Sequence, residues 1–247
     1  MLQGLYNLTS GVLTQNRNLN VISNNMVNVS SPGFKKDTMV STTFKEEMLY
    51  RAQNNGSNSS SELNNASKIR SATETMVNHE QGAFEETGNP LDMALAEKGF
   101  FEIQSPSGRL YTRNGSFIID EQGYLALPSI GRVMGQSGPI LLNTDKIQVE
   151  TDGTIRGVEG NVIDKVKVVD FENYDALQKT PAGLFIGNDP QAVNGHIVQN
   201  TLERSNVSMI SEMTSMMTSQ RAIQSAAQII KIYDQLMAKA TTELGRL

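Results

Sequence analysis

The residues that could carry out acid–base chemistry are a few carboxylates that lie close together in the sequence. Glu85 and Glu86 form one group, and Asp145, Glu150 and Asp152 form another. A glycosidase needs two carboxyl groups about 5–10 Å apart across a sugar cleft. Nothing in the spacing fixes that geometry, and both groups flank turns, where solvated charge is normal. We therefore expect no catalytic residues and keep a hydrolase only as an alternative.

The composition argues against several other kinds of site. The chain has no cysteine, so it has no disulfide, thiolate metal site or cysteine nucleophile. His79 and His196 are far apart and have no further ligands at short spacing, so we expect no metal and no cofactor. The net charge of -5 disfavours nucleic acid, whose phosphates need a basic surface. No small-molecule substrate is implied either.

The N-terminus does not have the pattern of a conventional secretory signal peptide. Residues 1–30 carry one basic residue, Arg17, and no compact apolar block before a small-residue cleavage site. No run of about 18 apolar residues exists that could cross a membrane. We expect either a cytoplasmic protein or one that leaves by a route that reads an uncleaved terminus.

Both ends of the chain carry apolar residues at a spacing of seven, which is typical of helices that pack along a seam. We predict helices from about Leu2 to Val29 and from about Leu202 to Leu244. The second helix is too long to stand alone, and the first is its only possible partner within the chain. The predicted assembly interface comprises Leu5, Val12, Leu19, Ile22, Met26, Met209, Met216, Ile223, Ile230, Met237 and Leu244.

Further apolar residues lie off these rows and would face water in an isolated monomer. An exposed apolar stripe usually marks a surface for a partner. The alternative is that the two helices close on the rest of the chain as an ordinary core. The methionines of the last helix have two interpretations, filler of such a core or adaptable contacts with neighbours. The residues off the rows are Leu13, Met217, Ile229, Ile232 and Leu236.

Between the helices the pattern changes to short strands separated by glycine turns. Such spacing indicates an antiparallel sandwich or barrel, and no long helical pattern interrupts it. The predicted strands cover residues 100–104, 110–112, 117–120, 124–127, 147–150, 154–156 and 166–171. We thus predict an α+β fold. It consists of a discontinuous coiled coil (1–30 with 202–247), an extended connector with a polar loop (31–74), and a central antiparallel all-β domain (75–201).

Two segments near the helices resemble the signatures of bacterial flagellar rod and hook proteins. The run ISNNMVNVSSPGFK at 22–35 resembles the N-terminal signature of that family, and its matching residues are Asn24, Asn25, Asn28, Pro32, Gly33 and Phe34. The C-terminal signature is matched by Ser205, Asn206, Val207, Glu212, Gln220 and Arg221. This chain has Ile223 where the family usually has tyrosine, which keeps the apolar row.

The middle of the chain resembles the same family. Matching segments are GNPLDMA at 88–94, GFF at 99–101, YTRNGSF at 111–117 and GYL at 123–125. The length favours the FlgF-type proximal rod or FlgG-type distal rod protein over the longer hook proteins. Residues 177–185 favour the proximal type, with the distal type as the alternative. A wall-associated hydrolase and a phage-tail-like β module are less favoured interpretations of the same sequence.

The resemblance implies a structural subunit rather than an enzyme. In this family the terminal helices line a helical tube that transmits torque and forms the wall of an export channel, and the β domain forms its outer layer. The implied partners are further copies and other rod or hook subunits, and the flagellar type III export apparatus. The implied location is the basal body. Phe44 and Met48 resemble a possible export element, with an ordinary amphipathic turn as the alternative.

Overall fold

The computed structural model describes residues 2–43, 70–106, 108–157 and 159–244, and the chain divides into two compact units. The helical unit holds helix α1 (Leu2–Val27), strands β1 (Asp37–Thr43) and β2 (Arg70–Val77), and helix α3 (Met209–Leu244). The strand unit holds residues 28–36 and 78–207. The fold is therefore α+β with a central β region, as predicted. The domain boundaries given above stay predictions.

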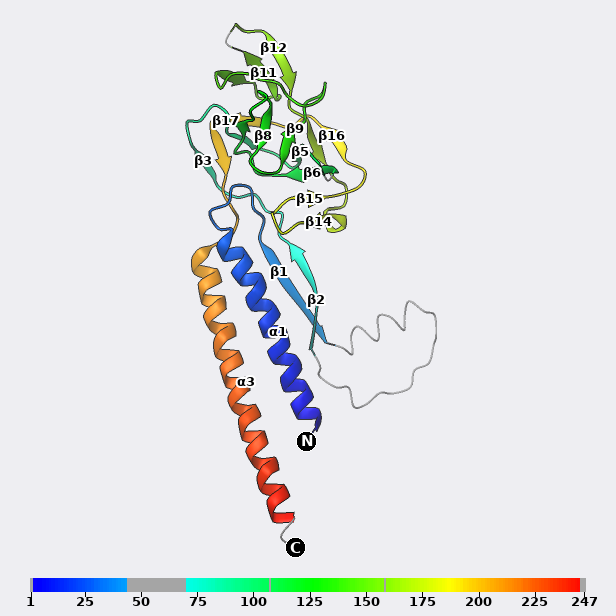
Figure 1. Cartoon of the computed structure of the whole chain (residues 1–247), viewed down its shortest axis with the longest axis vertical. Coiled ribbons are helices and arrows are strands. Elements are labelled where there is room, and N and C mark those ends of the chain that lie inside the picture. Colours follow the sequence, from blue (N-terminus) through cyan, green and yellow to red (C-terminus); the bar gives the residue numbers. More distant parts are fainter. Residues whose placement is uncertain (1, 44–69, 107, 158, 245–247) are drawn as a thin grey trace, which may run out of the picture. The chain divides into compact units, whose positions relative to one another are not determined.

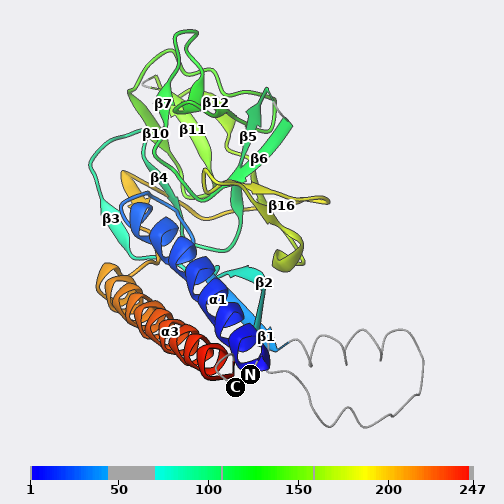
Figure 2. The ribbon, with the colours of Figure 1, turned by 60° about the horizontal axis from the view of Figure 1, so that its bottom comes forward.

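In the helical unit α1 and α3 lie side by side and run in opposite directions, with β1 and β2 beside α1 (Figures 1 and 2). The two strands pair antiparallel, from Asp37 opposite Val77 to Thr43 opposite Arg70. A step of seven residues toward the N-terminus of α1 lies opposite a step of seven residues toward the C-terminus of α3. This register follows from three close approaches, Asn25 with Glu212, Asn18 with Ser219, and Gly4 with Tyr233.

The predicted start of the last helix near Leu202 is wrong. Leu202 lies in strand β18 (Thr201–Glu203), and α3 begins at Met209. The Ser205 hydroxyl accepts a hydrogen bond from the Val207 amide, and the Asn206 side chain also bonds to the backbone. Such bonds offer the chain an alternative to the helix, so α3 starts beyond them. Helix α1 ends at Val27, two residues before the predicted end.

The strand unit is built from antiparallel pairs throughout its described residues, as predicted. Each of the predicted strand windows contains a strand. The longest path of paired strands does not close on itself among the described residues. It runs through β14 (Gln178–Lys179), β15 (Phe185–Ile186), β6 (Gly108–Thr112), β5 (Phe100–Ser105), β9 (Gly131–Val133), β8 (Leu125–Leu127) and β7 (Ile118–Ile119).

The remaining strands form smaller groups around this path. Strand β13 (Val168–Asp170) pairs with both β5 and β16 (Gln191–Val193). The other groups are β10 (Ile147–Val149) with β11 (Thr154–Gly157) and β12 (Val162–Lys165), β4 (Met93–Leu95) with β17 (Ile197–Gln199), and β3 (Phe84–Glu86) with β18. A short 3-10 helix, η1, covers Tyr174–Ala176.

The hydrophobic core of the chain lies in the strand unit. Phe101, Ile103, Leu125 and Val133 are fully buried there, and the ring of Phe101 meets the edge of Phe117 at 5.2 Å between centroids. Burial of such side chains contributes about 1.5–3 kcal/mol each to stability. In α3, by contrast, no large apolar side chain that the structure describes is fully buried. The helical unit therefore has apolar surface that its own chain does not cover.

Candidate functional site

The face of α3 that meets α1 is a narrow seam with alternating spacings of three and four residues. The α3 seam comprises Glu212, Met216, Ser219, Ile223, Ala226, Ile230 and Tyr233, all of which are buried or partly buried. Three of the six predicted row residues of this helix, Met216, Ile223 and Ile230, fall on this seam and meet α1 of their own chain. Met209 and Met237 continue the row at its two ends, but they are 38% and 46% exposed.

The ends of the row are exposed because α1 is shorter than α3. The register places Leu2 level with residue 235 of α3, so residues 236–244 extend about 14 Å beyond α1. The prediction that the apolar residues off the rows face water is confirmed. Each is more than a third exposed: Leu13, Met217, Ile229, Ile232 and Leu236.

Asn25 of the N-terminal signature is a buried polar link inside the helical unit. Its side-chain amide donates to the Asp37 carbonyl at 2.8 Å and to the Glu212 carboxylate at 3.4 Å, and its oxygen accepts from the Asp37 amide at 2.9 Å. One side chain thereby ties α1 to both β1 and α3. Buried polar residues of this kind fix the register of paired helices, because a shifted register leaves them without partners.

The second half of the signature lies in the strand unit. Gly33 has a φ of +67° and donates its amide to the Glu203 carbonyl at 2.7 Å. A Cβ atom at Gly33 would stand 2.3 Å from the Arg113 carbonyl carbon, so only glycine fits. The buried ring of Phe34 lies 3.8 Å from the Lys179 ammonium, which also donates to the Lys35 carbonyl.

Lys35, Glu203 and Arg113 form a buried charge cluster. The Lys35 ammonium lies 2.6 Å from one Glu203 oxygen, and the Arg113 guanidinium lies 3.6 Å from the other. Their side chains are 1%, 1% and 6% exposed. Lys35 also donates to the Glu80 carbonyl, and the Gly82 amide donates to Glu203. Burial lowers the pKa of Lys35, while the bond with Glu203 opposes that shift.

Asn206 of the C-terminal signature joins three separate segments of the strand unit. Its side-chain oxygen accepts from the Lys36 amide at 2.7 Å, and its nitrogen donates to the carbonyls of Asn78 and Glu80 at 2.9 and 3.0 Å. All three bonds go to backbone groups, so the side chain organises the path of the chain. Asn25, Gly33 and Asn206 thus hold the path of the backbone through hydrogen bonds.

His79 lies in an aromatic cluster beside these residues. Its ring centroid is 4.8 Å from that of Tyr174, 5.4 Å from Phe185 and 6.2 Å from Phe100. Burial, together with the positive charges of Lys35, Lys179 and Arg113, lowers the pKa of the imidazole to about 4, although Asp175 opposes the shift. His79 is therefore neutral at pH 7 in the folded chain.

This lowered pKa predicts a pH dependence of stability. An unfolded histidine titrates near pH 6.5, so below that pH the unfolded chain binds a proton that the folded chain does not. The stability that His79 contributes is complete above about pH 6.5 and is lost as the pH falls toward 4. We expect the free energy of unfolding, measured by urea denaturation between pH 6.5 and 4, to fall less with decreasing pH for His79→Gln than for the unchanged chain. A His196→Gln control, at an exposed position, should show the same fall as the unchanged chain. An equal fall of the free energy of unfolding in all three proteins would contradict the prediction.

The predicted signature residues occupy quite different environments. Asn25, Gly33, Phe34, Val207 and Glu212 are buried, whereas Asn24, Gln220 and Arg221 are exposed. Asn28, Pro32, Ser205 and Asn206 lie between these extremes. The possible export element, Phe44 and Met48, lies outside the described residues, and the side chain of Leu244 does too.

Three of the five carboxylates considered for acid–base chemistry are engaged in ordinary structural contacts. Glu150 pairs with Arg156 at 2.6 Å, and Asp152 accepts hydrogen bonds from the amide and hydroxyl of Thr154 within a turn. Glu85 pairs with Arg204 at 3.5 Å, where both side chains are exposed. None of the five lines the hollow described next.

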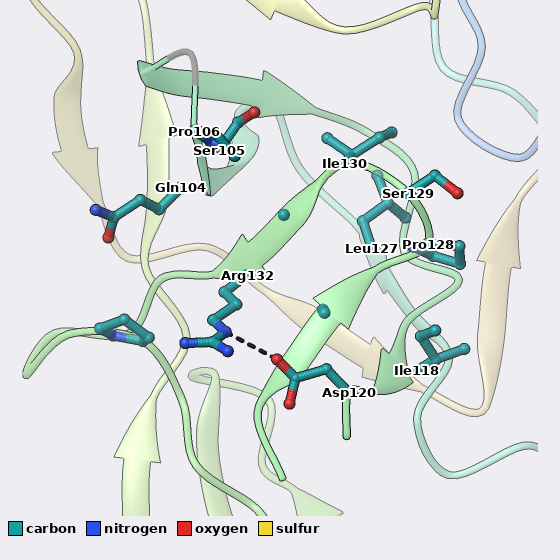
Figure 3. A pocket seen from close by; sticks show the side chains of 13 residues that line it. Gln104, Ser105, Pro106, Ile118, Asp120, Leu127, Pro128, Ser129, Ile130 and Arg132 are labelled. Carbon is teal, nitrogen blue, oxygen red and sulfur yellow. Dashed lines mark hydrogen bonds and ion pairs between the residues drawn. The ribbon is translucent and has the colours of Figure 1, made fainter. Parts of the chain in front are cut away.

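One hollow in the strand unit has a volume of about 650 Å³ and is apolar for the most part. Figure 3 shows Ile118, Pro128 and Ile130 along it, with Arg132 pointing toward Asp120. Arg132 donates to Asp120 at 2.8 Å and stacks on the ring of Tyr124. Arg132 and Asp120 are the only ionisable residues of the described lining. Because they bind each other, the hollow presents no free acid or base.

The part of the chain that the structure describes contains no group of three or more His, Asp or Glu side chains placed to hold a metal ion. It also contains no helix with the length and apolarity required to cross a membrane.

Three positioning residues were not predicted from the sequence: Lys35, Arg113 and Glu203. They are far apart in the chain, and their charged side chains are of the kind usually found at the surface. Lys35 ends the N-terminal signature, and this position was the one available indication of its role.

Comparison with known protein families matches two segments of the chain, its middle and its C-terminal part, to flagellar proteins. Residues 94–157 match the family described as flagellar hook protein FlgE/F/G D1 domain, and residues 198–243 match flagellar basal body rod FlgEFG protein C-terminal. The first match covers the β5–β11 region, and the second covers β18 and nearly all of α3.

Curated relatives are similar to the chain over nearly its whole length. A flagellar basal-body rod protein FlgG of Bacillus subtilis is 31% identical, over 96% of this chain and 97% of its own. FlgG of Buchnera aphidicola subsp. Acyrthosiphon pisum is 30% identical, over 97% and 98%. Flagellar basal-body rod protein FlgF of Caulobacter vibrioides is 28% identical, over 98% of each chain.

Proposed function

Because this chain belongs to the family of flagellar basal-body rod proteins of the FlgF/FlgG type, we propose that it is a structural subunit of the rod in the flagellar basal body. It polymerises through its terminal helices into a helical tube that transmits torque and forms the wall of the export channel. Its partners are further copies, other rod or hook subunits, and the type III export apparatus. It carries out no catalysis, and nothing in the described surface favours a hydrolase.

The observation that carries this proposal is the uncovered apolar surface of α3. Six large apolar side chains of this helix are more than 45% exposed: Ile210, Met213, Met217, Ile232, Leu236 and Met237. A stripe of this size in water marks a surface for a partner. Contacts that do not close into a ring generate helical filaments, which suits a tube. The exposed methionines fit adaptable contacts with neighbours better than core filler.

Two finer structural features belong to the same proposal. We expect α1 and α3 to form an antiparallel two-stranded coiled coil, because their register advances by seven residues on each helix. We expect the β region to act as a sandwich or barrel that forms the outer layer of the tube. The heptad spacing and the fully buried apolar core support these two expectations respectively.

The type of rod protein is a separate prediction. The relatives named above carry both names at 28–31% identity, and identity in this range does not separate the two types. The proximal, FlgF-type assignment rests on residues 177–185, and the distal, FlgG-type protein is the alternative. The number of copies in each basal body distinguishes them.

The proposal predicts that Ile223→Asp blocks incorporation of the chain into basal bodies. Ile223 lies on the α3 seam, and a carboxylate there would lose part of its hydration against α1. We expect cells that make only this variant to lack complete rods, while the purified variant keeps the circular dichroism of its strand unit. The matched control, Gln224→Asp, puts the same charge on an exposed neighbouring position and should be incorporated. Normal incorporation of Ile223→Asp would show that the paired helices are not needed for assembly.

A further inference from the structure

Each half of α3 carries one exposed apolar patch. The N-terminal patch is Ile210, Met213 and Met217, and the C-terminal patch is Ile229, Ile232 and Leu236. Their side chains are between 43% and 80% exposed. Neither patch belongs to the α3 seam, so neither is used by α1 of the same chain.

The two patches lie on opposite sides of the seam. Taking the seam residues as positions a and d of a heptad, with Met216 at a and Ser219 at d, the N-terminal patch occupies positions b, e and b. The C-terminal patch occupies positions g, c and g. Positions b and e follow the seam on one flank of a helix, and positions c and g on the other. Each half of α3 therefore has its apolar flank on a different side.

The opposite flank of each half is polar. In the N-terminal half, positions c and g hold small hydroxyl residues, Ser211, Ser215 and Thr218. In the C-terminal half, positions b and e include the charged residues Lys231 and Asp234. Apolar residues scattered singly over a helix surface are normal, but these six are grouped, three on one flank in each half. The arrangement fits two different contacts, one for each half.

We propose that the N-terminal patch of one copy packs against the C-terminal patch of a neighbouring copy of this chain, a contact that rests on the proposed function as a rod subunit. Two parallel α3 helices side by side face each other with opposite flanks, so the b and e flank of one meets the c and g flank of the next. The patch centres, Met213 and Ile232, are about 29 Å apart along the helix. Neighbours are therefore displaced by about this distance.

This contact is head-to-tail, because each copy uses two different surfaces. A copy that has joined through one patch still presents the other, so the row of copies continues and does not stop at a dimer. The exposed ends of the heptad row, Met209 and Met237, extend the apolar surface next to each patch.

Disulfide cross-linking tests the proposal cleanly, because the chain has no cysteine of its own. Basal bodies are purified from cells that make Met213→Cys/Ile232→Cys, oxidised, and run on a non-reducing gel. We expect a ladder of covalent dimers, trimers and larger species. Each single variant should stay monomeric, whereas basal bodies containing both single variants should give dimers and no ladder.

The matched control is Ser215→Cys/Asp234→Cys, which has the same separation along α3 but lies on the two polar flanks. It should give no ladder. The proposal is overturned if the first double variant stays monomeric within basal bodies, if the control pair links equally well, or if Met213→Cys alone links to itself. Absence of the unchanged chain from basal bodies would instead contradict the proposed function, so the two failures are distinguishable.

Discussion

Glu203→Gln should lower the free energy of unfolding of the strand unit by about 3–5 kcal/mol. The substitution keeps the size of the side chain but removes the one carboxylate that lies against both Lys35 and Arg113. Two almost fully buried cations would then face each other without this counter-charge. The cost of an unpaired buried charge is much larger than the net value of the pair. Urea denaturation of the purified chain, followed by circular dichroism, measures the change.

The control for this prediction is the same substitution in an exposed pair. Glu85 pairs with Arg204 at 3.5 Å, but the two side chains are 61% and 64% exposed. Exposed pairs of this kind contribute about 0–1 kcal/mol, so Glu85→Gln should have little effect. Equal losses for Glu85→Gln and Glu203→Gln would show that the buried cluster has no special role in the fold.

Gly33→Ala should also be strongly destabilising, by about 3–5 kcal/mol, for two separate reasons. The φ of +67° is unfavourable for any residue with a Cβ atom. That atom would also stand 2.3 Å from the carbonyl carbon of Arg113 and 2.4 Å from the amide nitrogen of Asn114. Backbone atoms cannot move aside as a flexible side chain does, so the turn that places Phe34 and Lys35 would shift.

Gly88→Ala separates the two contributions. Gly88 has a similar φ of +72°, but among the described residues no atom beyond its two chain neighbours lies within 4 Å of a Cβ atom built there. Gly88→Ala should therefore lower the free energy of unfolding only by the conformational cost, about 1–2 kcal/mol. The difference between the two variants, measured by urea denaturation, then reports the clash at Gly33. No difference would mean that the chain around Arg113 relaxes without cost.

Much of the fold was predictable because its patterns are local. Strands such as β5 and β10 follow from alternating apolar residues between glycine turns, and the two helices follow from their heptad rows. The start of α3 was predicted too early because residues 202–206 are held by strand pairing and by side-chain hydrogen bonds. The periodicity of the sequence does not reveal such contacts. A tertiary partner, Glu85 for Leu202, decided that segment.

The site was less predictable because its contacts join distant parts of the chain. The heptad rows identified the apolar face of α3 but not which residues α1 would cover. That depends on the register, which buried polar contacts such as Asn18 with Ser219 help to set. The charge cluster of Lys35 and Glu203 joins residues 168 positions apart, and neither has a composition that distinguishes it from surface charge.

The most direct test of the rod assignment is peptide mass mapping of purified hook–basal bodies from the source cell, compared with the soluble fraction. The assignment predicts that this chain is found in the basal bodies as a stoichiometric component, with a copy number that separates the proximal from the distal type. Detection of the chain only in the soluble fraction, in cells that build complete flagella, would contradict the proposed function.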